Sequence, residues 1–294
     1  MIEPSCRVHV NWEHFRHNIG ILMQKEHELM PVIKADAYGH GVAKAAMELE
    51  RLGIRWAAAG TLREAALVRE SGFTGHIVAL LSRVPGRDDV ALALEKNLVP
   101  LIHNKEGLHS VQEESIMIKT VNLQKIFKTE EVQTLALARL GFPLSDMEKV
   151  AAFLAEHTNI RPLVQVSHFS VADEPDEDAY TAMQCDIFYR AADIMHRYFP
   201  DMRCSLGNTA GLAVQVTKKD DICRPGLALY GYDPMFGTSR EGACKGLLPV
   251  MEVSAPIISV HPLHKGESLG YGRAYKAASR CRHCLEPRLA SLRW

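Results

Sequence analysis

Short apolar runs that alternate with helical segments are the feature that most limits how this chain can fold. The clearest runs cover residues 29–35, 55–60, 76–81, 98–103, 163–170, 203–208 and 222–231. Between the first two runs, apolar residues recur at the three- and four-residue spacing of a buried helix face, at Val42, Ala45, Ala46, Leu49 and Leu52. Strands separated by helices pair in parallel, so we predict repeated βα units around a parallel sheet.

The number of units favours a closed barrel. One further strand is expected between residues 120 and 140, which makes eight, and eight units predict a (β/α)8 barrel over residues 11–231. An open, doubly wound sheet is the competing architecture, but it usually carries a G-x-G-x-x-G motif after its first strand, and none is found here. Beyond the barrel the pattern becomes rich in strands, so we predict a β-rich domain over 232–294, packed with an N-terminal segment of residues 1–10.

The composition favours a globular protein whose ligands are small molecules. The chain has 294 residues, of which 47% are hydrophobic, and a net charge of −1. A charge this small gives no electrostatic reason to expect a nucleic acid or an anionic membrane as partner. We find no run of roughly 18 apolar residues and no signal-peptide pattern, and therefore expect a cytoplasmic protein.

The cysteines do not indicate a disulfide framework or a metal site. Seven of them are scattered along the chain, which is typical of reduced thiols. Cys281 and Cys284 alone have the spacing of metal ligands, but no second cysteine or histidine pair lies nearby, so an incidental pair is favoured over a zinc site. The acidic run at 173–178 is likewise expected to be a solvated loop.

The residues that follow the predicted strands are unusually polar. The loops at these strand ends form the mouth of a barrel, and there the sequence has Lys34, Tyr38, His168, Asn208, Thr209, Arg224 and Gly226. A lysine shielded from water can be a neutral amine and form a Schiff base with an aldehyde such as pyridoxal phosphate. Taken alone, Lys34 would also suit a surface position at the end of a strand, and His168 would suit a buried structural histidine.

The loop after the seventh predicted strand could hold the phosphate of such a cofactor. Thr209 offers a hydroxyl at the start of a predicted helix, where free N–H groups favour an anion. Gly226 lets the backbone approach a ligand closely.

Five stretches resemble the alanine racemase family and follow one another in the family's order. They are VIKADAYGHG (32–41), ARLGF (138–142), SHFSVADEPD (167–176), GNTAG with RPGLALYG (207–231) and SLGYGRAY (268–275). The resemblance implies a pyridoxal phosphate barrel joined to a β-rich C-terminal domain. It also implies an isomerase that interconverts L- and D-alanine, acts as a homodimer and supplies D-alanine for peptidoglycan.

The same resemblance implies a role for each site residue. Lys34 would bind the cofactor covalently, while Tyr38, Thr209 and the backbone at Gly226 and Leu227 would hold its phosphate, with Asn208 beside them. Arg224 would face the pyridine nitrogen, His168 would help to position it, and Arg139 would reach the cofactor phenolate or the substrate carboxylate. Tyr271 would be the second base, because inversion needs a proton donor on the face opposite Lys34.

Two segments depart from the family. Ahead of Arg139 the family has a Lys-x-Asp-Thr-Gly-Met run, whereas residues 132–137 read VQTLAL here, and the altered stretch extends back to about residue 120. From about residue 278 the chain resembles nothing in the family, so we expect a truncated β domain. Two alternatives therefore stay open: a barrel that binds pyridoxal phosphate without turnover, and a racemase or decarboxylase for another amino acid.

Overall fold

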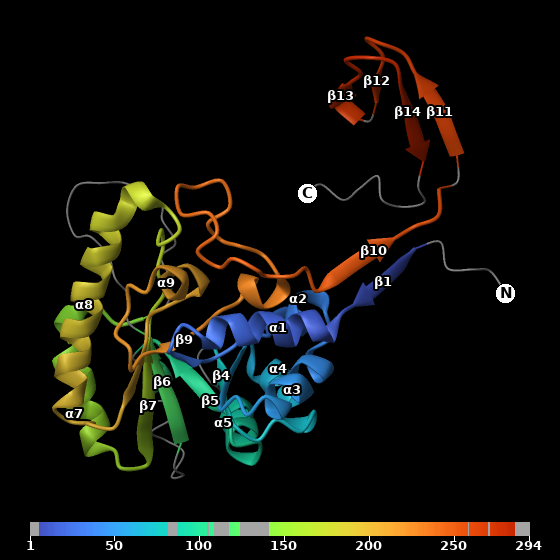
Figure 1. Ribbon diagram of the computed structural model, residues 1–294. Helices are drawn as coiled ribbons and strands as arrows, with labels where there is room; N and C mark the ends of the chain where they lie inside the picture. The colour runs from blue at the N-terminus through green and yellow to red at the C-terminus, as the bar shows by residue number, and fades with distance from the viewer. Residues whose placement is uncertain are drawn as a thin grey trace. The chain divides into compact units, whose positions relative to one another are not determined.

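The computed structural model describes residues 6–81, 87–104, 106–108, 118–123, 141–257, 259–269 and 271–285 (Figure 1). Arg139, the departing run 132–137 and the tail beyond residue 285 lie outside these residues. The chain divides into two compact units: Trp12–Pro249, and Met1–Asn11 with Val250–Trp294. The domain ranges expected from the sequence, 1–10, 11–231 and 232–294, stay a prediction.

In the described part of the larger unit, eight parallel strands close into a barrel. They are β2 (Glu28–Leu29), β3 (Trp56–Ala59), β4 (His76–Ala79), β5 (Val99–Ile102), β6 (Ile118–Leu123), β7 (Ile160–Val166), β8 (Arg203–Ser205) and β9 (Ile222–Cys223). Strands β3 to β8 form one sheet in chain order, and β2 pairs with β9. A bridge between Val32 and Ala58 joins the segment after β2 to β3, and the N–H of Arg224 donates to the carbonyl of Gly207 at 2.7 Å beyond β8. The predicted (β/α)8 barrel is confirmed.

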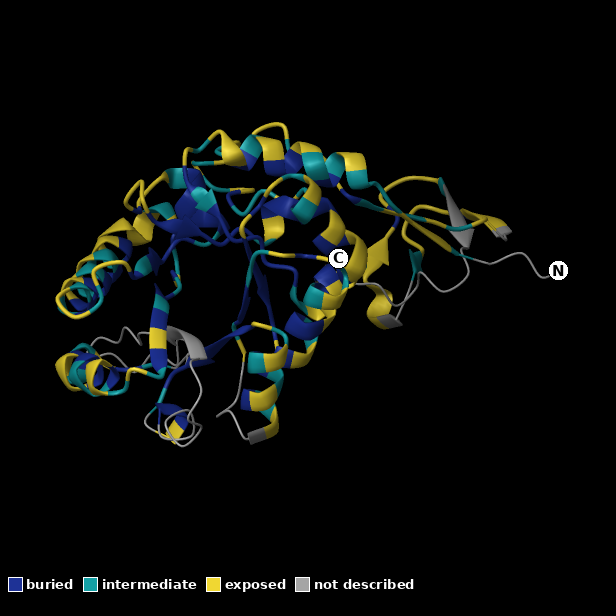
Figure 2. Ribbon diagram, turned by 90° about the horizontal axis from the view of Figure 1, so that it is seen from below, coloured by how far each residue is buried: buried dark blue, intermediate teal, exposed yellow. Residues whose placement is uncertain are grey.

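Helices surround the strands. In Figure 2 the buried strands form an inner ring, and the exposed residues lie on the outer faces of the helices. The helices are α1 (Trp12–Met23), α3 (Val42–Arg51), α4 (Leu62–Glu70), α5 (Arg87–Glu95), α7 (Met147–Glu156), α8 (Asp178–His196) and α9 (Thr209–Val214), with the short turns α2 (Lys34–Gly39), η1 (Leu144–Asp146), η2 (Pro175–Glu177) and η3 (Leu227–Tyr230). The predicted apolar face of α3 is buried at Val42, Ala45, Ala46 and Leu49.

Apolar side chains of the strands fill the inside of the barrel and fix the strand ends. One buried cluster joins residues of six strands and their extensions, namely Met30, Val32, Trp56, Ala58, Val78, Val99, Leu101, Val164, Val166 and Ile222. Close packing of this kind resists small displacements of the backbone. The polar residues that follow these strands are therefore held on a rigid frame.

Two of the predicted strands are shorter than their apolar runs. The run 29–35 forms a strand only up to Leu29, and the run 222–231 only up to Cys223, after which η3 begins. Pro31 and Pro225 interrupt the two ladders because proline has no N–H to donate. Their carbonyls still accept, since Ala58 N–H donates to Pro31 and Val32 N–H donates to Pro225, both at 2.9 Å. The strand expected between 120 and 140 is β6, which begins at Ile118.

The smaller unit is rich in strands, as predicted. It contains β1 (Arg7–Val10) paired with β10 (Met251–Ser254), β11 (Ser259–Leu263) paired with β14 (Cys281–Leu285), and β12 (Ser268–Leu269) paired with β13 (Tyr275–Lys276). All three pairs are antiparallel. A short turn, η4 (Tyr271–Arg273), lies between β12 and β13.

Neither a metal cluster nor a membrane helix is found in the described ranges. No three histidine, cysteine or acidic residues among them are grouped so that they could hold a metal ion. None of the helices described is both long enough and apolar enough to cross a membrane.

Candidate functional site

Lys34 is the first residue of a strained turn at the mouth of the barrel. The turn labelled α2 is left-handed, because Ala35, Asp36, Ala37 and Tyr38 all have φ between 51° and 54°. None of these residues is glycine, and a left-handed backbone costs about 1–2 kcal/mol for each such residue. A turn with this cost persists only where neighbouring groups hold it in place. The position of Lys34 therefore depends on those groups.

Hydrogen bonds within the segment supply part of this support. Ala37 N–H donates to the carbonyl of Ile33 at 3.1 Å, and Gly41 N–H donates to the carbonyl of Asp36 at 2.9 Å. The Asp36 carboxylate accepts from Val42 N–H, the first amide of α3, at 2.7 Å. Asp36 thus ties the turn to the helix that follows it.

An aromatic cluster supports the other side of the turn. The buried ring of Tyr230 lies 5.2 Å from the ring of Tyr38 and 4.4 Å from that of His40, measured between centroids. The Tyr230 hydroxyl donates to the carbonyl of Val32 at 3.2 Å. Burial raises the pKa of Tyr230, so its hydroxyl stays protonated for this bond. Sequence reasoning did not single out Tyr230, because an aromatic residue near a strand end is also typical of core packing.

Three groups from separate strand ends converge beside this turn. Gly226 N–H donates to the hydroxyl of Thr209 at 2.9 Å. A Cβ atom on Gly226 would lie 3.4 Å from the hydroxyl oxygen of Tyr38 and 3.9 Å from Cβ of Val32. Burial raises the pKa of Tyr38, so that its phenol is a neutral hydrogen-bond donor. Tyr38, Thr209 and Gly226 form a small polar cradle, which we call the Tyr38 cradle.

Asn208 shapes the cradle indirectly. Its side chain accepts from Gly211 N–H at 2.9 Å and so caps the N-terminus of α9. A cap of this kind fixes the backbone at which the helix begins. Asn208 therefore holds Thr209 in position, and the predicted start of a helix at Thr209 is confirmed.

Arg224 is buried at the end of β9 and is held by groups from two other strands. Its Nη1 donates to both the carbonyl and the hydroxyl of Ser205, each at 2.6 Å. Its Nη2 donates to the carbonyl of Ser167 and lies 3.3 Å from Nδ1 of His168. The Ser205 hydroxyl in turn donates to the carbonyl of Ile222 at 2.6 Å. These contacts keep a permanent positive charge fixed at the barrel mouth.

The structure brings most of the predicted residues to this end of the barrel. The Nζ atom of Lys34 lies 5.9 Å from the ring centroid of Tyr38, beside the cradle. Arg224 and His168 form a second group, joined to the cradle through the short chain from Arg224 to Gly226. Leu227 follows as the half-exposed first residue of η3. Sequence reasoning missed Ser205 and Ser167, since their contacts with Arg224 come from residues distant in sequence.

Two predicted residues are not part of this arrangement. Arg139 lies outside the described residues. Tyr271 begins η4 in the other compact unit, and its role stays a prediction.

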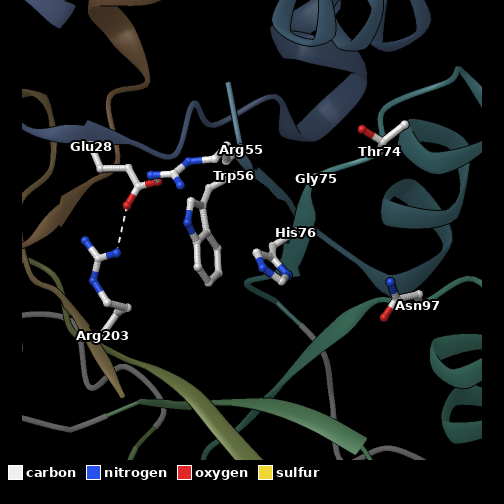
Figure 3. Close-up of a pocket in the computed structure, with 8 residues that line it drawn as sticks. All are labelled: Glu28, Arg55, Trp56, Thr74, Gly75, His76, Asn97 and Arg203. Atoms are coloured by element: carbon white, nitrogen blue, oxygen red, sulfur yellow. Dashed lines mark ion pairs between the residues drawn. The ribbon is translucent and has the colours of Figure 1, made fainter. Parts of the chain in front are cut away.

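A cavity of about 350 Å³ lies at the opposite, amino end of the strands (Figure 3). Its lining residues are Glu28, Arg55, Trp56, Thr74, Gly75, His76, Asn97 and Arg203. The Glu28 carboxylate already pairs with Arg55 at 2.7 Å and with Arg203 at 2.9 Å. This end of a barrel serves stability rather than chemistry, so the site at the mouth remains the functional candidate.

The chain is similar in sequence to proteins of one family. The family described as "Alanine racemase, N-terminal domain" matches residues 10–234. An alanine racemase of Nitratidesulfovibrio vulgaris (strain DP4) is 39% identical over 248 residues, which make up 84% of this chain and 64% of that protein. An alanine racemase of Lawsonia intracellularis is 34% identical over 277 residues, covering 94% and 72% of the two chains.

Solved structures agree in fold. The biosynthetic alanine racemase from Pseudomonas aeruginosa matches with a TM-score of 0.77 at 27% identity, over 95% of this chain and 74% of the other. The alanine racemase from a D-cycloserine-producing Streptomyces lavendulae matches with a TM-score of 0.78 at 23% identity, over 96% and 73%, which supports the fold alone.

The barrel and the site at its mouth together define an α/β-barrel protein with the fold of pyridoxal phosphate enzymes. More particularly, the chain belongs to the alanine racemase family. Its match spans 64% of the length of the Nitratidesulfovibrio relative.

Proposed function

We propose that this protein binds pyridoxal phosphate at the barrel mouth and interconverts L- and D-alanine. The observation that carries the proposal is Lys34, held on a rigid left-handed turn directly beside the Tyr38 cradle. An amine for the aldehyde and a set of donors for the phosphate are the two features that this cofactor requires. The family to which the chain belongs supports the same choice.

The residues present fit the cofactor. A phosphate takes hydrogen bonds from hydroxyl and backbone N–H groups. The cradle has the hydroxyls of Tyr38 and Thr209 and the N–H of Gly226, which donates to Thr209 in the protein without a ligand. The lack of a side chain at Gly226 leaves room for the oxygens beside Tyr38. Leu227, next in the chain, would add a second backbone donor.

When bound, pyridoxal phosphate withdraws electrons from the α-carbon of the amino acid and makes its proton acidic. Lys34 Nζ would hold the cofactor and then accept or return that proton on one face. Racemisation needs a donor on the other face, and we assign this role to Tyr271, in a homodimer. Arg224 would disfavour a second positive charge at the ring nitrogen, because its guanidinium cannot lose its own proton. His168 would keep Arg224 in place, and Arg139 would bind the phenolate or the substrate carboxylate.

A second candidate function is cofactor binding without turnover. The observation that favours it is the run 132–137, where the polar residues of the family are replaced by VQTLAL directly before Arg139. A barrel altered in this way would retain the lysine and the cradle but lose the groups that orient the substrate.

One experiment on the whole chain separates these functions. Purified protein is mixed with pyridoxal phosphate, and visible absorbance and the loss of optical rotation are followed for L-alanine, L-serine and further amino acids. We expect the visible band of lysine-bound cofactor together with racemisation of alanine. A visible band without turnover of any amino acid would favour the second function, and the absence of the band would contradict both.

The cradle predicts a phosphate-specific defect for Thr209→Val. The variant loses one hydroxyl, and a hydrogen bond to a charged group contributes about 1.5–3 kcal/mol. We therefore expect affinity for pyridoxal phosphate to fall about 10- to 100-fold, while affinity for pyridoxal, which has no phosphate, stays unchanged. Titration followed by absorbance measures both. Thr217→Val, which removes a buried hydroxyl near Cys223 instead, is the matched control and should leave both affinities unchanged.

A further inference from the structure

Glu64 connects the turn that carries Lys34 to a helix 29 residues further along the chain. Its Oε2 accepts from Gly60 N–H at 2.8 Å and from Thr61 N–H at 3.1 Å. Its Oε1 accepts from Ala35 N–H, the amide that follows Lys34, at 3.0 Å. The two oxygens therefore have separate tasks.

The first task is an ordinary helix cap. Thr61 accepts from Glu64 N–H at 3.2 Å, and the Glu64 carboxylate accepts from Thr61 N–H in return, which completes the capping box of α4. Such a box satisfies free N–H groups at the start of a helix. It does not require the third bond, to Ala35.

The third bond is made at the first left-handed residue of the turn. Ala35 begins the series of positive φ angles, and its N–H donates to the Glu64 carboxylate, a group outside the turn. An acceptor at this amide fixes the direction in which the chain leaves Lys34. Because a carboxylate accepts at both oxygens, one side chain can cap α4 and hold Ala35 at the same time.

Gly60 makes this reach possible. A Cβ atom at position 60 would lie 2.4 Å from Oε2 of Glu64 and 3.4 Å from Cβ of Lys34. Any side chain there would displace the carboxylate from its place between α4 and the turn. The glycine at the end of β3 is thus explained by the close approach of Glu64 to the lysine.

We propose that Glu64 is a positioning residue for Lys34: its carboxylate anchors the left-handed turn through Ala35 N–H, with Gly60 providing the space. The role in cofactor attachment rests on the proposed function. The anchoring of the turn does not rest on the proposed function, because the bond from Ala35 N–H to Glu64 is present in the protein without any ligand.

Glu64→Gln isolates the bond to Ala35. A glutamine has one acceptor oxygen and one NH₂ donor. With its oxygen toward Gly60 and Thr61 it keeps the cap, but its NH₂ then faces Ala35 N–H, and two donors cannot form a hydrogen bond. Thr61→Val is the matched control, since it removes the other half of the capping box and leaves the carboxylate bond to Ala35 in place.

Hydrogen exchange on the unliganded 294-residue chain tests the anchor directly. In Glu64→Gln we expect the amides of residues 35–41 to exchange about tenfold faster, while those of α4 change little. In Thr61→Val we expect the opposite, with faster exchange at the start of α4 and no change at 35–41. Equal effects of the two variants on residues 35–41, or none in Glu64→Gln, would overturn the proposal.

A second measurement and a second variant complete the test. On adding pyridoxal phosphate, Glu64→Gln should form the lysine-bound visible band about tenfold more slowly than Thr61→Val. Gly60→Ala should reproduce both effects of Glu64→Gln and also speed exchange at the start of α4, because the displaced carboxylate leaves the cap as well. The double variant should add little to either effect, since both changes break the bond to Ala35. Additive effects would contradict the role given to Gly60. If wild-type protein forms no visible band, the proposed function fails while the exchange result still decides the role of Glu64.

Discussion

Lys34→Ala is expected to abolish the visible band formed with pyridoxal phosphate and to lower alanine racemisation at least about a thousandfold. The variant loses the amine that would bind the cofactor and also one of the two bases, and a positioned base alone contributes about 10²–10⁴-fold. Affinity for the phosphate should persist, since the Tyr38 cradle is unchanged. Absorbance spectra and polarimetry on the same samples measure the two losses.

Lys44→Ala provides the control for this variant. Lys44 lies ten residues further along, on α3, where its exposed amine pairs with Glu48 at 2.9 Å. We expect a normal visible band and normal turnover, because this amine is on the outer face of a helix. A visible band that survives in Lys34→Ala would show that another lysine binds the cofactor, and the assignment of the site would be wrong.

Arg224→Met is expected to lower the free energy of unfolding by about 3 kcal/mol or more, with a loss of cofactor affinity. A methionine of similar length removes a donor from the carbonyl of Ser167 and from the Ser205 hydroxyl, and one of the two donors from the carbonyl of Ser205, which also accepts from Ser167 N–H at 3.0 Å. Each buried polar group left unsatisfied costs about 1–3 kcal/mol. Urea unfolding measures the change in stability, and titration with pyridoxal phosphate measures the change in affinity.

Arg190→Met is the matched control for Arg224→Met. Arg190 is exposed on α8 and pairs with Asp186 at 3.6 Å. An exposed ion pair contributes about 0–1 kcal/mol, so the variant should unfold at almost the same urea concentration as the wild type. Similar midpoints for the two variants would show that the buried contacts of Arg224 do not stabilise the barrel.

Local patterns predicted the elements whose cause is local. The apolar spacing of α3 and the start of α9 at Thr209 each depend on residues within one or two turns. The extent of β2 and β9 was not predicted correctly. The apolar runs continue past Pro31 and Pro225, and the predicted strands followed these runs to their ends. The structure ends the strands earlier, because each proline lacks the N–H group that would continue the ladder.

The candidate site was predicted in part for the same reason. Lys34, Tyr38, Thr209 and Gly226 were found because each follows a strand, and a barrel brings all strand ends to one mouth. Tyr230 and Ser205 were missed. Their contacts, to Val32 and to Arg224, join residues 198 and 19 positions apart, and neither residue type is distinctive at its place in the sequence.

By itself, the sequence determined the barrel, the order of its strands and the set of polar residues at its mouth, because periodicity and strand order are properties of neighbouring residues. The tertiary structure alone decided how Lys34 is held. Four residues without a glycine adopt a left-handed turn, and nothing in their identities predicts it. Contacts with Glu64, Asp36 and Tyr230 together offset its cost, and two of these residues are brought to the turn only when the barrel closes.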